Sequence, residues 1–148
     1  MAWDRNDLIP QTEITEKVTQ RTVDFAKRFG AYLGKDDRRS STDRNGRNIE
    51  IKESKLTTSQ LRKFFGEVKR QQMSGYDETD FVLLKPKLAY AVGRAKDANA
   101  KINDFYFVIS KAIDNVNSEL HFKNFIKVFE AIVAYHKAAE ESKLNDNN

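Results

Sequence analysis

The most regular apolar pattern in the chain lies in residues 118–141, and it constrains the fold more than any other feature. Apolar side chains recur there with the period of one face of an α-helix. The apolar positions are Phe122, Phe125, Ile126, Phe129, Ile132 and Val133, whereas Lys123, Lys127, Glu130 and Lys137 occupy the opposite side. A helix with so apolar a face must pack against other elements, so we expect Phe129 to be buried in a core.

The same spacing predicts further helices over residues 12–34, 57–75, 78–98 and 101–117. Thr12 or Thr15 can cap the first of these, and Thr57 with Gln60 has the spacing of a capping box for the second. Pro86 falls inside the third and predicts a kink or a new helix start, because proline lacks a backbone N–H donor. The short connections favour antiparallel neighbours, so the predicted fold is all-α, a compact bundle of about five helices.

Composition supports this fold class and excludes several others. The length of 148 residues matches one ordinary domain, so residues 1–148 are predicted to form a single helical domain. Only 6 glycines and 2 prolines are present, too few for the turns of a β-sandwich or barrel. The absence of cysteine removes disulfides, thiolate metal ligands and cysteine nucleophiles. No stretch resembles a signal peptide or a membrane span, so we expect a cytoplasmic protein with no membrane partner.

Two segments are predicted to lack regular structure. Residues 36–51 are almost wholly polar up to Ile49 and include the turn dipeptide Asn45-Gly46, which predicts a mobile loop. Residues 142–148 are predicted to be a frayed tail.

The sequence contains no recognisable catalytic motif. HExxH, GxSxG, Walker A and GxGxxG patterns are absent, which argues against the usual hydrolase, metal and nucleotide sites. Histidine, the commonest general base, occurs twice. His136 falls on the apolar side of its helix and is predicted to be a hydrogen-bonded core residue, and His121 to be an ordinary surface residue. We therefore expect a protein that is not an enzyme, with no catalytic residue, metal ion or cofactor.

Positive charge is concentrated in the middle of the chain, where residues 52–101 contain 11 Lys or Arg and 6 Asp or Glu. On the predicted helix over 57–75, Arg62, Lys63 and Arg70 project away from the apolar side with Lys69 beside them, a cationic face that suits nucleic acid. Gly66 lies within this face, where its missing side chain leaves room for a phosphodiester backbone. A solvated face with a tolerated glycine is an equally open interpretation.

A second basic stripe combines cations with an aromatic ring. Lys87, Tyr90 and Arg94 line one flank of their predicted helix, where cations can hold phosphates and the ring can stack on a base or sugar. Alternatively, Tyr90 is a half-buried residue at the edge of the core. Trp3 and Phe107 are predicted to be exposed anchors for a partner, the alternative being isolated surface aromatics.

Three stretches together resemble a known family: LTTSQLRKFFGEVKR at 56–70, LLKPKLAYAVGR at 83–94 and FKNFIKVFEAIVAYHK at 122–137. In order and spacing they are similar to the Csm small subunit of type III-A CRISPR effector complexes. The resemblance covers about residues 56–138. It implies an all-helical, non-catalytic subunit of an antiviral ribonucleoprotein, present in several copies. Its implied partners are guide RNA, target RNA, the backbone and large Csm subunits, and other copies of itself.

The resemblance also implies which residues contact RNA. A subunit that accepts any guide sequence reads phosphates and duplex shape and leaves sequence to base pairing. This predicts RNA contacts by Lys55, Arg62, Lys63, Lys69, Arg70, Lys87, Tyr90 and Arg94, with Lys85 as a neighbouring candidate. The last two predicted helices are net acidic and rich in Phe, so we expect subunit contacts there, with Phe107 as the anchor. With a net charge of only +4, one copy is expected to bind RNA weakly, and tight binding is expected from repeated copies.

Three other functions are compatible with the same residues. A stand-alone helical adaptor without an RNA partner would keep the charged faces solvated. A small ribonuclease or nucleotide-binding enzyme would bring its Asp, Glu, His and Lys together only on folding. A helix-turn-helix DNA regulator is the least favoured, because no short turn is followed by a helix rich in base-reading residues.

Overall fold

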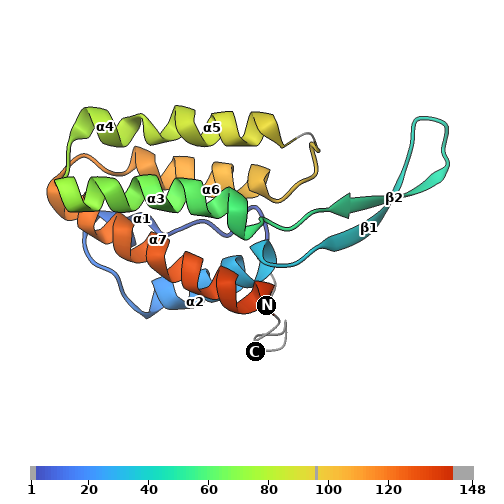
Figure 1. Ribbon diagram of the computed structural model, residues 1–148. Helices are drawn as coiled ribbons and strands as arrows, with labels where there is room; N and C mark the ends of the chain where they lie inside the picture. The colour runs from blue at the N-terminus through green and yellow to red at the C-terminus, as the bar shows by residue number, and fades with distance from the viewer. Residues whose placement is uncertain (1–2, 96, 142–148) are drawn as a thin grey trace.

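The computed structural model describes residues 3–95 and 97–141. In chain order its elements are α1 (Gln11–Thr15), α2 (Gln20–Leu33), β1 (Asp37–Thr42), β2 (Asn48–Glu53), α3 (Thr58–Ser74), α4 (Glu78–Val82), α5 (Leu84–Arg94), α6 (Ile102–Asp114) and α7 (Glu119–Glu140). The helices form a bundle, and the two strands extend from one end of it (Figure 1). The predicted helical bundle is confirmed, with a β-hairpin that the prediction lacked.

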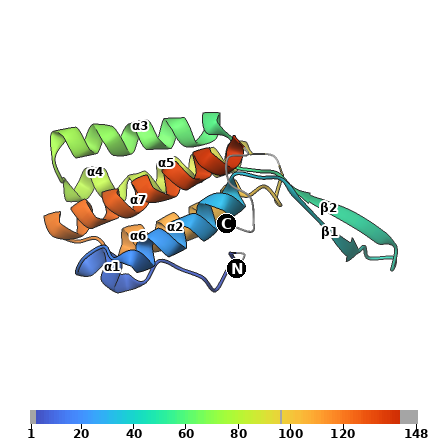
Figure 2. The same cartoon turned by 90° about the horizontal axis from the view of Figure 1, so that it is seen from below.

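Helix α7 is the element around which α1, α2 and α3 pack, and Figure 2 shows it running between α2 and α3. Its Phe129 side chain is fully buried, as predicted. The ring centroid of Phe129 lies 5.5 Å from that of Phe64 on α3 and 6.2 Å from that of Phe105 on α6. Aromatic rings at such separations stabilise a core beyond the area they bury. The apolar face predicted for residues 118–141 therefore joins three helices into one core.

Two glycines allow α2 to approach α7 closely. A Cβ atom on Gly30 would lie 2.6 Å from the Cβ of Tyr135 and 2.7 Å from the backbone nitrogen of His136. A Cβ on Gly34, one turn later, would lie 2.8 Å from the Cβ of Ala139. Carbon atoms in ordinary contact are about 3.5–4.0 Å apart. A side chain at either glycine would therefore push the two helices apart.

Local signals in the sequence set several helix ends. The Thr57 hydroxyl accepts the backbone N–H of Gln60 at 3.1 Å, and the Gln60 side chain accepts the N–H of Thr57 at 2.8 Å, which is the predicted capping box of α3. Gly75, with φ of +93°, ends this helix where expected. Leu83 separates α4 from α5, so the new helix start predicted near Pro86 is also confirmed.

The helix predicted over residues 12–34 is two helices, and its expected caps are wrong. α1 ends at Thr15, and α2 begins after Thr19, whose side chain caps it. Buried Glu13 holds the break, since its carboxylate accepts N–H and hydroxyl groups of Thr19 and Thr22 at 2.7–3.0 Å. Burial raises the pKa of Glu13, but these hydrogen bonds outweigh it and lower the pKa below its ordinary value. Apolar spacing carries no information about such a bridge.

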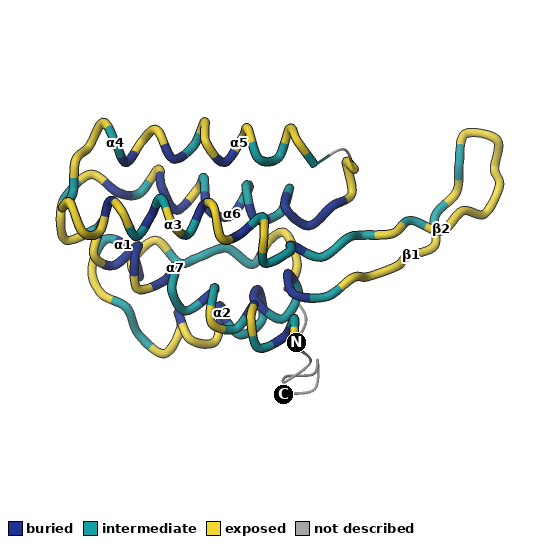
Figure 3. Tube along the Cα trace, viewed as in Figure 1, coloured by how far each residue is buried: buried dark blue, intermediate teal, exposed yellow. Residues whose placement is uncertain are grey.

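Residues 36–51, predicted to be a loop, instead form most of an antiparallel β-hairpin. The Asp43 carboxylate orders the turn by accepting the N–H groups of Asn45 at 2.8 Å and Arg47 at 2.9 Å. Gly46 adopts φ of +79°, a conformation that favours glycine. The hairpin is nevertheless as solvated as its polar composition indicates, because most of its residues are exposed (Figure 3).

Lys101, at the start of α6, ties the root of the hairpin to the bundle. Its side chain is fully buried, and its ammonium donates to the carbonyls of Tyr32 and Lys35 at 2.7 Å and to the Asp37 carboxylate at 2.5 Å. A buried ammonium requires such a set of acceptors, because it has lost its water shell. The backbone N–H of Lys101 donates to the carbonyl of Ser54 at 2.8 Å. The two strands are thus fixed at both of their inner ends.

Two further observations complete the fold. Among residues 3–95 and 97–141, no helix combines the length and apolarity that crossing a membrane requires. The tail predicted for residues 142–148 lies outside the described residues.

Candidate nucleic-acid interface

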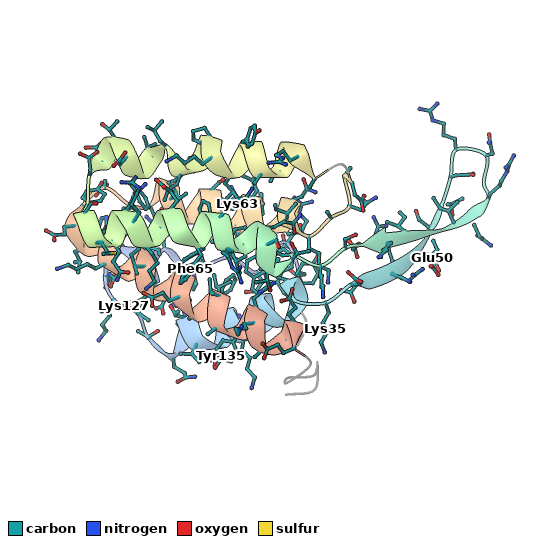
Figure 4. The ribbon with its side chains drawn as sticks, in the orientation of Figure 1. Lys35, Glu50, Lys63, Phe65, Lys127 and Tyr135 are labelled. Atoms are coloured by element: carbon teal, nitrogen blue, oxygen red, sulfur yellow. The ribbon has the colours of Figure 1, made fainter. Side chains whose placement is uncertain are left out.

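The predicted cationic face lies on α3 and α5, which pack against each other and run in opposite directions in Figure 1. Arg62 and Lys63 are exposed on α3, whereas Leu61 and Phe64 are buried, so these cations project outward as predicted. Figure 4 shows Lys63 on the side of α3 nearer to α5. Arg70 of α3 and Lys87 of α5 share one surface, since both bind the same carboxylate, whereas Lys69 lies toward Glu130 of α7.

Glu67 occupies the middle of this surface and links its two helices. Its carboxylate accepts a hydrogen bond from Arg70 of α3 at 2.6 Å and another from Lys87 of α5 at 2.6 Å. Arg70 also lies 3.5 Å from the carboxylate of Asp80. The hydrogen bonds from Arg70 and Lys87 hold the pKa of Glu67 at about 2. Because Glu67 stays ionised, it partly neutralises the positive charges of Arg70 and Lys87, two of the residues predicted to contact RNA.

Three more predicted cations also have carboxylate partners: Lys55 pairs with Glu140, Lys69 with Glu130 and Lys85 with Asp114. The nitrogen–oxygen distance is 3.9 Å in the first pair and 3.3 Å in the second. Solvent-exposed ion pairs add little to stability and are screened by salt. A phosphate can therefore compete with the carboxylate in each pair.

Arg62, Lys63 and Arg94 differ from these cations, because within residues 3–95 and 97–141 they have no carboxylate partner. The Arg94 guanidinium lies 5.9 Å from the ring centroid of Tyr90. Tyr90 is 69% exposed, so the alternative of a half-buried core residue is wrong. The two helices thus offer three cations that no described carboxylate neutralises, and one of them, Arg94, lies beside a solvent-facing ring.

Gly66 lies among these cations on α3. A Cβ atom at this position would meet nothing within 4 Å, so packing within the described chain does not require glycine here. The residue leaves a patch of bare helix backbone next to Lys63, Lys69 and Arg70. This geometry agrees with close approach of a ligand and also with a tolerated glycine.

Neither of the two predicted aromatic anchors is fully exposed. Trp3 is buried, with its ring centroid 4.8 Å from that of Phe29, so its predicted exposure is wrong. A lone apolar residue outside any periodic segment gives no pattern that could reveal such packing. Phe107 is only partly exposed, and its ring centroid lies 5.0 Å from the guanidinium of Arg5 and 5.1 Å from the ammonium of Lys111.

The histidines take structural positions. His136 is buried with its Nε2 2.5 Å from the carbonyl of Leu56, which confirms the predicted core histidine. His121 is partly exposed, and its Nδ1 accepts the N–H of Asn117 at 3.2 Å beside the start of α7. In the part of the chain that the structure describes, no three His, Asp or Glu side chains gather as metal ligands would.

These features define a class: a small helical bundle whose exposed basic surface spans two packed helices. The family model described as Csm2 Type III-A matches residues 35–142. The chain therefore belongs to the Csm2 family, the small subunits of type III-A CRISPR Csm effector complexes. These subunits are structural components that associate with other Csm subunits. Comparison with curated proteins and with solved structures gives no significant match.

Proposed function

We propose that this Csm2 protein is a non-catalytic subunit that holds the backbone of target RNA paired to guide RNA. The contact surface, called the α3–α5 face below, consists of Arg62, Lys63, Lys69, Arg70, Lys87, Tyr90 and Arg94, with Lys55 at its margin. The observation that carries the proposal is that Arg62, Lys63 and Arg94 have no described carboxylate partner and that Arg94 lies beside the exposed ring of Tyr90.

The chemistry of this face suits phosphates better than base edges. Lysine and arginine bind phosphate oxygens without regard to sequence. Arginine offers five N–H donors, so Arg70 can keep its bonds to Glu67 and still reach a phosphate. The ring of Tyr90 can stack on a base or sugar of any identity. A face of this kind follows an RNA whose sequence is read by base pairing alone.

Repetition would supply the affinity that one copy lacks. Several copies on one RNA bind with an effective concentration set by their spacing, which raises avidity without new contacts. Phe107, partly exposed between two cations, is our proposed contact to another Csm subunit. Phe107→Ala is expected to reduce recovery of the assembled particle in size-exclusion chromatography, and an unchanged profile would remove this residue from the interface.

The RNA contact is tested with Arg62→Glu combined with Lys63→Glu. Neither residue forms an ion pair within the described ranges, so the double variant is expected to stay folded. Its matched control is Lys17→Glu with Lys127→Glu, two exposed cations outside the α3–α5 face. We expect weaker anisotropy binding to every RNA sequence and a salt slope lower by about 2, or about 1 for each phosphate that is no longer neutralised. The control is expected to weaken binding much less.

Co-purification with the other subunits tests the same contact inside the particle. The tagged wild-type chain is expected to elute in a large particle that contains guide RNA, and the Arg62→Glu, Lys63→Glu chain is expected to be depleted from it. Recovery of the wild-type chain as a small protein without RNA would favour the stand-alone adaptor. Equal RNA affinity of the double variant and its control would remove RNA binding from this face.

A further inference from the structure

The hairpin over residues 37–53, called the arm below, carries two isoleucines on one face, of which Ile49 is exposed and Ile51 partly exposed. Directly opposed residues of an antiparallel pair lie on the same face. Ile51 stands opposite Arg39, and Ile49 stands opposite Ser41, so the two isoleucines share a face. Ile49 is 39% exposed. Two-stranded hairpins are marginally stable in water, and an exposed isoleucine face adds to the gain from docking on another surface.

The arm is held in a fixed direction at its root. Besides the anchor at Lys101, the N–H of Leu56 donates to the carbonyl of Leu33 at 2.8 Å, and the N–H of Lys55 donates to the Asp36 carboxylate at 2.8 Å. Six antiparallel residues span about 20 Å, and the arm projects clear of the helices in both Figure 1 and Figure 2. A surface fixed in this way loses little conformational entropy when it docks.

The opposite end of the bundle carries most of the remaining exposed apolar side chains. These residues, called the far-end patch below, are Met73, Val82, Leu83 and Leu120. They belong to the end of α3, to α4 and its C-cap, and to the start of α7, and Figures 1 and 2 show these segments together at the end away from the arm. Contiguous apolar patches on small proteins mark interaction sites.

The charges at the two ends are complementary. Arg44 and Arg47 are exposed at the tip of the arm, and within the described ranges neither has a carboxylate partner. At the far end, Asp77 and Glu78 are exposed, and neither forms an ion pair within those ranges. Opposite charges placed beside an apolar contact fix its register and exclude wrong partners.

We propose that the arm of one copy docks on the far-end patch of the next copy, with Arg44 and Arg47 beside Asp77 and Glu78. Because the two surfaces lie at opposite ends of one chain, the contact is heterologous, so copies join head to tail and not as a closed pair. The inference rests on the proposed function only in requiring several copies. It involves no residue of the α3–α5 face.

Cross-linking tests the contact directly, since the chain contains no cysteine. A full-length chain carrying Ile49→Cys with Leu83→Cys is treated with a bismaleimide reagent. We expect a ladder of dimer, trimer and higher species on a denaturing gel. The matched control pairs Ile49→Cys with Lys137→Cys, an exposed site at the end of α7 away from the far-end patch, and is expected to give no ladder. A double variant no different from its control, or a product that stops at dimer, would overturn the proposal.

Charge reversal distinguishes this partner from RNA. Arg44→Glu with Arg47→Glu, or Asp77→Asn with Glu78→Lys, is expected to weaken self-association about tenfold in sedimentation at low salt. Asparagine keeps the helix cap that Asp77 provides. A chain with all four changes is expected to regain part of its self-association, because the arm tip is then acidic and the far end carries a lysine in place of its acidic pair. If the arm variant instead loses RNA affinity and the four changes do not restore association, the arm binds RNA and the proposal fails.

The same protein variants separate this proposal from the proposed function. Arg62→Glu with Lys63→Glu is expected to leave the cross-linked ladder intact while RNA binding falls. A ladder without RNA binding would reject the RNA contact and keep the docking contact. RNA binding without a ladder would do the reverse.

Discussion

The same substitution at two helical glycines is predicted to change stability in opposite directions. Gly66 of α3 faces open space, whereas a Cβ at Gly30 of α2 would lie 2.6–2.9 Å from atoms of Tyr135 and His136 on α7. Alanine in a helix interior is more favourable than glycine by about 1 kcal/mol. Gly66→Ala therefore raises the free energy of unfolding by about 1 kcal/mol.

At Gly30 the same gain is opposed by overpacking. Extra methyl groups in a well-packed core cost about 1–3 kcal/mol. The cost at Gly30 is expected at the upper end of that range, because a Cβ there would lie about 1 Å closer to backbone atoms of α7 than ordinary carbon contacts. Backbone atoms, unlike the end of a flexible side chain, cannot move without shifting the helix. Gly30→Ala is expected to lower the free energy of unfolding by about 1–2 kcal/mol.

Thermal unfolding followed by circular dichroism measures both effects. At about 2–4 °C per kcal/mol, Tm is expected to rise by about 3 °C for Gly66→Ala and to fall by about 2–8 °C for Gly30→Ala. Equal increases for the two variants would refute the argument that α2 and α7 need glycine at their closest approach. The Gly66→Ala chain also tests the role of Gly66 in RNA binding. If RNA approaches the helix backbone at Gly66, this variant is expected to bind RNA more weakly although it is more stable.

Three further predictions concern the core, the arm and the α3–α5 face. Phe129→Ala removes a fully buried ring and is expected to lower the free energy of unfolding by about 3–5 kcal/mol in urea titrations. Lys101→Met removes the ammonium from the root of the arm and is expected to speed amide exchange in residues 37–53 while α7 stays protected. The pKa of Glu67 is about 2 in the folded protein, so its stabilisation is complete above its ordinary pKa of 4.5 and is lost as pH falls toward 2. Glu67→Gln is expected to flatten that part of a plot of Tm against pH.

The sequence predicts those parts of the fold that depend on neighbours along the chain. The Thr57 and Gln60 capping box, the break before Pro86 and the apolar face of α7 are all local patterns, and all are confirmed. The break between α1 and α2 depends instead on Glu13, which bonds a residue nine positions later. That contact forms only once the chain turns back on itself.

The arm was not predicted because its polar composition outweighed two local signals. Ile49 and Ile51 alternate with polar residues, and Asn45-Gly46 is a common hairpin turn. The anchor at Lys101, which holds the root, lies far along the chain and carries no motif. Composition alone could not show that this segment is ordered.

The candidate site shows a similar division. Helical spacing correctly places the cations of α3 on the outside. It cannot show which of them are neutralised, because Glu130 and Glu140 come from α7 and reach Lys69 and Lys55 through the tertiary fold. The distinction between cations with and without a carboxylate partner, on which the RNA proposal rests, needed the structure.

The position of α7 in the chain has a consequence for synthesis. This helix is made after every other described element, yet α1, α2 and α3 all pack against it. Asn124 of α7, for example, donates to the carbonyl of Ile14 at 2.9 Å across 110 positions of sequence. While the ribosome is still translating residues 119–140, α1 and α2 lack the helix that they pack against most, whereas α3, α5 and α6 can already pack against one another. The apolar surface of α1 and α2 is therefore exposed in the nascent chain until α7 has emerged, and the core is complete only when this last helix packs.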